Sequence, residues 1–300
     1  MELHHLRYLV AVAEECHFGR AAEKLYISQP SLSYAIKALE RELGIVLLHR
    51  TPRRVEVTDA GRDVVTTARR ALRSIDGVTA AAERHRAGHA GVLRIGFEAT
   101  GAGQFGTVVR QRFTERYPQV RVELARFDWG AEADAVRDGT VDVAFVWLPC
   151  DEQDLHLQTI VTEPRFAGVS LNHRLAGREQ LSIADLAGQP LMTTAKAPRF
   201  WVDWWAVNPR PDGSQVLWGP ENDNVEECLE HVADGVAACI CPASMVAFYR
   251  RPDIVWIPIT DIDPLHVAFA YRTGNDAPLV ASFADVVAEL LLEQSPEQLR

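Results

Sequence analysis

The sequence predicts an α/β protein in three parts: an N-terminal winged helix-turn-helix, a long linker helix and a C-terminal α/β domain. Two helical patterns broken by a tight turn occupy residues 18–43. One long helical pattern with an apolar repeat of 3.5 residues follows from Asp59 to about Gly88. From Val92 onward, short apolar runs alternate with helical patterns, as in strand-helix-strand units. A chain of 300 residues has room for these parts, because it corresponds to about two domains.

Residues 18–43 predict the helix-turn-helix itself, with an amphipathic helix over about 3–15 as its scaffold. Ser28 is a good N-cap for the second helix, and Pro30 suits its first turn because the missing N–H has no intrahelical partner there. The apolar packing faces of the two helices are predicted to be Ala21, Ala22, Leu25, Leu32, Ile36, Leu39 and Leu43. The alternative interpretation is an ordinary helical hairpin in a bundle.

A β-wing is predicted directly after the helix-turn-helix. Two short extended runs, 46–48 and 55–57, flank a basic turn that contains Pro52. Three arginines within five positions favour contact with phosphate or the minor groove over a solvated charge run. Together with the polar face of the second helix they complete the candidate DNA-binding set: Ser28, Gln29, Pro30, Ser31, Ser33, Tyr34, Lys37, Arg50, Arg53 and Arg54.

The formal charge of −10 is distributed unevenly along the chain. Residues 1–90 carry 14 Lys and Arg against 11 Asp and Glu, a balance of +3. The other 210 residues carry 17 against 30, a balance of −13. Only the N-terminal part can therefore approach phosphates without a large electrostatic cost.

The long helix is predicted to begin at Asp59, with Thr58 as its cap. Its apolar seam has coiled-coil spacing, which indicates pairing with a second helix, most simply that of a symmetry mate. The predicted dimerisation residues are Val64, Ala68, Ala71, Ile75 and Val78. Packing of the seam against its own chain is the alternative. His85 and His89 lie four residues apart, but this spacing is frequent on polar helix ends and no metal site is predicted.

The C-terminal part is predicted to contain an open, mostly parallel α/β sheet and a second α/β unit. In the first unit, strands and helices alternate over 92–97, 104–116, 120–124, 131–138 and 141–146. The second unit runs from about 163 to 265. Its strands are expected near 166–170, 190–194, 215–218, 237–241 and 254–258, and its helices near 182–187, 198–206 and 223–233. A strand at 267–271 and a helix at 278–292 complete the chain.

Several classes of protein are disfavoured by the sequence. No apolar run approaches the ~18 residues of a membrane span, and the N-terminus lacks a signal-peptide profile, so a cytoplasmic protein with no membrane partner is expected. The five cysteines show no CxxC spacing and are expected to be reduced, with a thiol sensor as the alternative. Because G-x-S-x-G, H-E-x-x-H and P-loop motifs are absent, an enzyme is not expected.

Residues 1–90 closely resemble the LysR-type transcriptional regulators. The resemblance rests on F-G-R-A-A-E-K-L-Y-I-S-Q-P-S-L-S, then L-E-R-E-L-G, and R-T-P-R-R-V-E-V-T-D-A-G. It implies a winged helix-turn-helix at 1–58, a dimerising linker helix and hinge at 59–90, and an effector-binding domain at 91–300. That domain is expected to resemble a periplasmic binding protein, with subdomain I at about 91–162 and 267–300 and subdomain II at about 163–266.

The resemblance also implies a homodimer or homotetramer that binds an interrupted inverted repeat in promoter DNA, with RNA polymerase as a further candidate partner. This chain departs from the family pattern at Tyr34, where the family usually has Arg. An aromatic hydroxyl replaces a fixed charge there, so we expect operator preference or salt dependence to differ.

The effector site is expected beyond the carboxyl ends of the strands, where ligands of open α/β sheets bind. Residues 100–103 lead into a helix whose N–H groups can hold an anion, and Trp129 and Trp147 are candidates for an aromatic wall. Trp201, Trp204 and Trp205 lie at helical spacing, so we interpret them as a buried face or subunit contact. The candidate effector-binding residues are Thr100, Gly101, Ala102, Gly103, Phe127, Trp129, Trp147, Thr193, Thr194, Lys196, Arg199, Phe200, Asn222 and Asn224.

These residues suggest a small organic co-inducer, acidic or aromatic, and no cofactor. The sequence therefore predicts a sequence-specific regulator that binds an effector between two α/β subdomains and changes its oligomer geometry on promoter DNA. The alternative is a solute-binding or small-molecule-modifying α/β protein with an accessory DNA-binding head.

Overall fold

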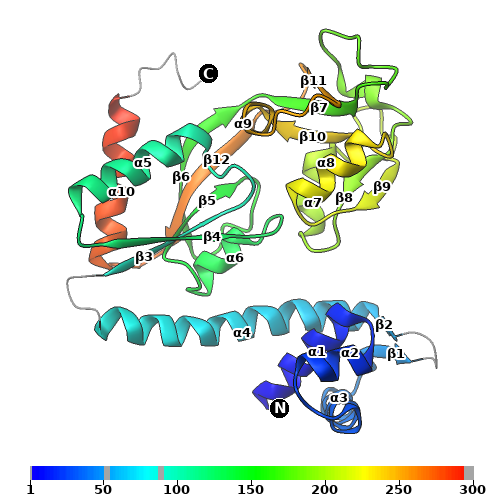
Figure 1. Cartoon of the computed structure of the whole chain (residues 1–300), viewed down its shortest axis with the longest axis vertical. Helices are drawn as coiled ribbons and strands as arrows, with labels where there is room; N and C mark the ends of the chain where they lie inside the picture. The colour runs from blue at the N-terminus through cyan, green and yellow to red at the C-terminus, as the bar shows by residue number, and fades with distance from the viewer. Residues whose placement is uncertain (1, 51–54, 87–90, 294–300) are drawn as a thin grey trace. The chain divides into compact units, whose positions relative to one another are not determined.

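The computed structural model describes residues 2–50, 55–86 and 91–293. The chain divides into two units, one with the residues up to Glu83 and one with most of the chain from Arg84 onward (Figure 1). The wing residues Arg53 and Arg54, most of the predicted hinge, and the side chains of Arg50, Val78 and His85 lie outside what is described.

The first unit, which we call the head, contains the predicted helix-turn-helix and wing. Its strands β1 and β2 pair antiparallel, with Leu48 opposite Val57. The elements are α1 (Leu3–Glu15), α2 (Phe18–Lys24), α3 (Gln29–Leu43), β1 (Leu48–Arg50), β2 (Val55–Val57) and α4 (Asp59–Arg86).

Side chains at the helix ends explain where the head's helices begin. The His17 ring accepts hydrogen bonds from the backbone N–H groups of Gly19 and Arg20 and caps α2. The Ser28 hydroxyl accepts from the Ser31 N–H at 3.3 Å and caps α3, as predicted. Thr58 caps α4 through a 2.9 Å bond from a backbone N–H in the first turn.

The head's core forms where the apolar faces of these helices meet. Leu9, Leu32 and Leu39 are fully buried in it. Leu43 was predicted to continue the α3 stripe but is 38% exposed, because α3 ends there and Gly44 turns the chain away with φ +70°.

The long helix α4 confirms the predicted start at Asp59. Its seam is only partly available to a second helix: Ala68 is 2% exposed and Val64 packs against the head's own core, whereas Ile75 is 37% exposed. The first turns of the seam therefore follow the alternative, packing within the chain.

The second unit is the effector domain, and its first lobe is built on a five-stranded sheet of order β4-β3-β5-β12-β6. β3, β4 and β5 are parallel, whereas β12 is antiparallel to both β5 and β6. The strands are β3 (Val92–Phe97), β4 (Arg121–Arg126), β5 (Val143–Trp147), β6 (Leu155–Glu163) and β12 (Leu265–Arg272). The helices are α5 (Gly103–Arg116), α6 (Glu132–Arg137) and α10 (Pro278–Glu293).

The second lobe contains a three-stranded antiparallel sheet of order β10-β7-β11 and a parallel pair, β8 and β9. Figure 1 shows the two lobes joined through the neighbouring strands β6–β7 and β11–β12. The strands are β7 (Arg165–Ser170), β8 (Leu191–Thr193), β9 (Trp218–Glu221), β10 (Cys239–Pro242) and β11 (Ile254–Pro258). The helices are η1 (Ile183–Leu186), α7 (Arg199–Ala206), α8 (Val225–Ala233) and α9 (Ala243–Phe248).

Two details of the expected sheet are corrected. The effector domain is less parallel than predicted, because β12 returns after about a hundred residues and inserts between β5 and β6. Strand β6 and helix α9 were not predicted. β6 lies at the sheet edge, where exposed His156 and Thr159 weaken its apolar pattern. In the described ranges, no helix has the length and apolar character that crossing a membrane requires.

Candidate functional site

The exposed face of α3 is the candidate DNA-binding surface of the head. Gln29, Ser31 and Lys37 are exposed there, while Leu32 and Leu39 on the other side are fully buried. Ser28 and Pro30 are also exposed, and Ser33 is half-buried. The helix therefore presents its hydrogen-bonding residues outward, as reading the edges of bases requires.

Two tyrosines extend this surface. Tyr34, which stands where the resemblance leads one to expect a cation, is 72% exposed. Tyr26 is 96% exposed and has φ +55° in the turn between α2 and α3. Sequence reasoning assigned Tyr26 only to the turn, because its exposure depends on the packing of three helices.

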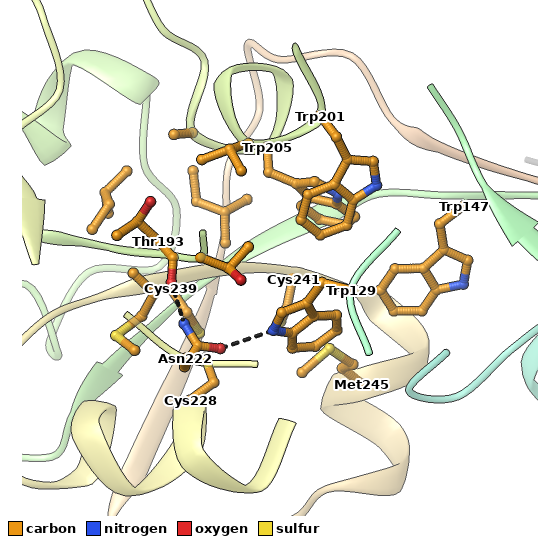
Figure 2. A pocket seen from close by; sticks show the side chains of 16 residues that line it. Trp129, Trp147, Thr193, Trp201, Trp205, Asn222, Cys228, Cys239, Cys241 and Met245 are labelled. Carbon is orange, nitrogen blue, oxygen red and sulfur yellow. Dashed lines mark hydrogen bonds between the residues drawn. The ribbon is translucent and has the colours of Figure 1, made fainter. Parts of the chain in front are cut away.

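A cavity of about 70 Å³ between the lobes of the effector domain is the candidate effector site. Trp129 and Trp147 come from the first lobe, and Trp201 and Trp205 come from α7 in the second (Figure 2). The ring centroids of Trp129 and Trp201 lie 6.2 Å apart in a stacked arrangement, and those of Trp147 and Trp205 lie 5.6 Å apart. Indole rings from both lobes thus form one continuous wall.

Asn222 is the central polar side chain of this cavity and is 6% exposed. Its Oδ1 accepts a 2.9 Å hydrogen bond from Trp129 Nε1, and its Nδ2 donates a 3.0 Å bond to the Thr193 carbonyl (Figure 2). Trp147 Nε1 donates to the Gly101 carbonyl at 2.8 Å. Two of the four indole N–H groups are therefore already paired within the protein.

Sulfur-containing side chains also line this cavity. Cys228 on α8 and Cys239 and Cys241 on β10 line the cavity together with Met192 and Met245. The two β10 cysteines share a strand face, as predicted, and both are buried. Burial raises the pKa of Cys241, and hydrogen bonding to Cys239 raises that of Cys228, so these two thiols stay neutral.

A buried pair of carboxyl groups holds the tryptophan-bearing segments of the first lobe. Glu98 Oε2 accepts from the Gly130 N–H at 2.6 Å, next to Trp129, and Glu132 Oε1 accepts from the Trp147 N–H at 3.2 Å. Burial raises the pKa of Glu98 well above its usual range and that of Glu132 to about 7. Both carboxyls are buried and the charge of Glu132 further raises the pKa of Glu98, so the pair retains a proton near neutral pH.

The structure brings five of the predicted effector residues to the cavity, namely Trp129, Trp147, Thr193, Thr194 and Asn222. It also places there Trp201 and Trp205, which we interpreted as a buried face, and the sulfur residues. Trp201 and Trp205 are buried, as we expected, but they form part of the cavity wall. Spacing alone did not distinguish a wall from an ordinary core.

The remaining predicted residues do not line this cavity. Thr100 bonds instead to Ser244 Oγ at 2.8 Å, and Asn224 caps α8. Lys196 and Arg199 are held by carboxylates, and Phe200 is 47% exposed. The other predicted residues that do not line the cavity are Gly101, Ala102, Gly103 and Phe127.

Comparison with known proteins gives a consistent result. Residues 3–62 match the family model of the bacterial regulatory helix-turn-helix protein, lysR family, and residues 86–292 match the LysR substrate binding domain. The chain is 31% identical over 295 residues to HTH-type transcriptional regulator AlsR of Bacillus subtilis (strain 168), covering 95% of both proteins. It is 40% identical over 268 residues to YnfL of Escherichia coli (strain K12), described as an uncharacterized HTH-type transcriptional regulator, covering 88% of this chain and 89% of that one.

Among solved structures, the chain is similar to full-length CbnR complexed with its target DNA. The TM-score is 0.54 at 25% identity, covering 97% of this chain and 100% of that one. The two family models together span most of the sequence, in the same order as the two units of the structure. The chain therefore belongs to the LysR-type family: it is a DNA-binding transcriptional regulator with an effector-binding domain, and not an enzyme.

Proposed function

We propose that this regulator recognises an interrupted inverted repeat in promoter DNA through the N-terminal half of α3. The observation that carries this proposal is the exposure of Gln29, Ser31 and Lys37 opposite a fully buried apolar stripe. Amide and hydroxyl groups read base edges in the major groove, and a lysine contacts phosphate. Arg50, Arg53 and Arg54 of the wing would add phosphate or minor-groove contacts.

The cavity between the lobes binds the effector in this proposal. Two contacts cross from lobe to lobe: Trp129 to Asn222, and Lys196 Nζ to Asp128 at 3.3 Å. Lys196 Nζ also lies 2.7 Å from Asp223 within the second lobe. A ligand that enters competes with or reinforces these contacts, so occupancy changes how the lobes close. Such a change in the effector domain would alter oligomer geometry on the operator.

The oligomer proposed is a homodimer paired through α4, with a homotetramer as the assembly on DNA. Ile75 supports the pairing because an exposed branched apolar side chain continues the seam beyond the part that the head covers. The regulator would act in the cytoplasm, with RNA polymerase as a candidate partner at the promoter.

A gel-shift titration on the DNA upstream of the protein's own gene tests operator recognition. We expect salt-sensitive, specific binding, and we expect Gln29→Ala to lower the preference for this DNA over random DNA by about 5- to 100-fold. Arg53→Ala should weaken binding to both DNAs alike. Glu23→Ala is the matched control, because Glu23 is exposed on α2, outside the proposed surface. Unchanged specificity of the Gln29 variant would contradict the proposed reading face.

A footprinting experiment tests the coupling to the cavity. Asn222→Leu removes the bond to Trp129 and fills part of the cavity with an apolar side chain. We expect the footprint of this variant to keep its position but to lose its response to the effector. A variant that still responds as the wild type does would place the effector elsewhere.

A further inference from the structure

The cavity described above has an unusual set of polar groups, and they restrict what it can bind. Among the described residues that line it, none is an aspartate, glutamate, lysine, arginine or histidine. Its surface consists mainly of indole rings, thioethers, thiols and aliphatic groups. Such polarizable side chains stack on and contact apolar or aromatic molecules.

The nearest predicted cations are not available to an anion in the cavity. Lys196 Nζ lies 2.7 Å from Asp223 Oδ2 and 3.3 Å from Asp128 Oδ2. Arg199 makes two bonds to the Asp203 carboxylate, at 2.7 and 2.9 Å. A carboxylate entering the cavity would lose its hydration without gaining a counter-charge, which strongly disfavours binding.

Two hydrogen-bond donors of the wall have no partner. The indole Nε1 atoms of Trp201 and Trp205 are buried and unpaired, and these side chains are only 7% and 8% exposed. Buried N–H groups are nearly always hydrogen-bonded in proteins, so these unpaired donors on cavity-lining side chains are the groups from which we expect a ligand to accept. Asn222 and Trp147 do not need an acceptor or donor from a ligand, because their side chains are already hydrogen-bonded within the protein.

The room available indicates the size of the ligand. A cavity of about 150 Å³ is known to hold benzene, and this one is about half as large. Thr193, Thr194 and Val202 also line a second, open hollow of about 490 Å³. The two spaces are therefore neighbours, and a molecule of about one ring fits if the side chains between them move apart.

We propose that the effector is a small uncharged molecule with one hydrogen-bond-accepting oxygen, such as a ketone or ether, on an apolar body of about one ring. Its oxygen accepts from the indole N–H of Trp201 or Trp205. This inference rests on the proposed effector role of the cavity, and it replaces the acidic co-inducer by a neutral one.

Three nearly isosteric probes test this ligand class on the full chain without DNA. Acetophenone is neutral with an acceptor, benzoate carries a charge, and α-methylstyrene lacks the oxygen. In calorimetric titrations we expect acetophenone to bind at least 10-fold more tightly than benzoate and several-fold more tightly than α-methylstyrene. Benzoate binding as tightly as acetophenone, or binding of none of the three, would overturn the proposal.

Trp→Phe variants locate the donor, because they remove the N–H and keep an aromatic ring. Trp201→Phe or Trp205→Phe should weaken acetophenone binding about 5- to 10-fold and leave α-methylstyrene unaffected. Trp256→Phe is the matched control: its Nε1 is also buried and unpaired, but it does not line the cavity. Equal effects of all three substitutions would refute the donor role.

Failure of the ligand class and failure of the proposed function can be distinguished. If acetophenone binds with this pattern but leaves the footprint on DNA unchanged, the ligand class stands and the effector role fails. If the footprint responds to a different, charged compound, the effector role stands and the ligand class fails.

Discussion

The head and the effector domain differ in how far apart in sequence their functional residues lie. The proposed DNA-reading residues of the head fall mostly within ten positions of one helix, α3. The cavity of the effector domain is lined from Trp129 to Met245, by strands, helices and loops of both lobes. The reading face depends on one helix and its cap, whereas the cavity depends on many distant contacts.

This difference indicates where each region is vulnerable. A substitution in the head acts mainly through a local cap or one contact with DNA. In the effector domain, a buried polar group far from the ligand can displace a wall of the cavity. Both kinds of effect can be measured separately, because all seven tryptophans lie between residues 129 and 256 and their fluorescence reports only on the effector domain.

Arg165→Ala should have the largest effect. Arg165 is 2% exposed and donates hydrogen bonds to the carbonyls of Asp263, Trp204 and Trp205. Its Cζ lies 4.1 Å from the centroid of the Trp204 ring. Removing it leaves the carbonyls of Trp204 and Trp205, near the end of α7, without a charged donor. We expect the free energy of unfolding of the effector domain to fall by about 3 kcal/mol in urea titrations followed by tryptophan fluorescence.

Arg178→Ala is the control for this prediction. Arg178 is exposed, and its Nη2 lies 3.6 Å from Asp185 Oδ2. Its loss should therefore lower the free energy of unfolding by less than about 0.5 kcal/mol. Equal stabilities of the two variants would show that Arg165 does not hold α7.

The carboxyl pair should make the effector domain pH-sensitive. Because the folded-state pKa of Glu132 is about 7 and that of Glu98 is also raised, the folded state binds protons more tightly than the unfolded state. The stabilisation of the folded state by protons on this pair is therefore complete below the ordinary glutamate pKa, and it is lost as pH rises toward 7. We expect a loss on the order of 1–3 kcal/mol between pH 5 and 7.5 in urea titrations.

Glu98→Gln identifies the source of this loss. A glutamine amide stays neutral at every pH and can accept from the Gly130 N–H as Glu98 does. The variant should therefore show a flatter pH dependence while matching the wild type near pH 5. A slope as steep as the wild type's would assign the pH dependence to other groups.

Ser28→Ala should have the smallest effect and should be confined to the head. It removes the α3 cap, at a cost of about 1 kcal/mol, visible as faster hydrogen exchange in the first turn of α3. Tryptophan-monitored unfolding of the effector domain should not change.

Ser28→Asp restores the cap but adds a negative charge beside the proposed reading face. We expect protection of α3 to recover while affinity for DNA decreases. Recovery of both would show that Ser28 lies away from the DNA.

Much of the architecture was predictable because its signals are local. Ser28, Pro30 and Gly44 mark the ends of α3, and strand and helix patterns located most elements of the effector domain within a few residues. β6 was missed because exposed side chains such as His156 and Thr159 interrupt its apolar pattern. The position of β12 was missed because pairing between distant strands leaves no local pattern.

For the candidate site, the sequence by itself determined the residues that face outward on α3 and the tryptophans at the ends of strands. Only the tertiary structure decided that Trp201 and Trp205 pack beside Trp129 and Trp147 in one cavity wall, and that Lys196 and Arg199 are paired with carboxylates. The physical reason is that helix periodicity and capping act over a few residues. Cavity lining and charge neutralisation depend instead on which distant segments meet once the chain has folded.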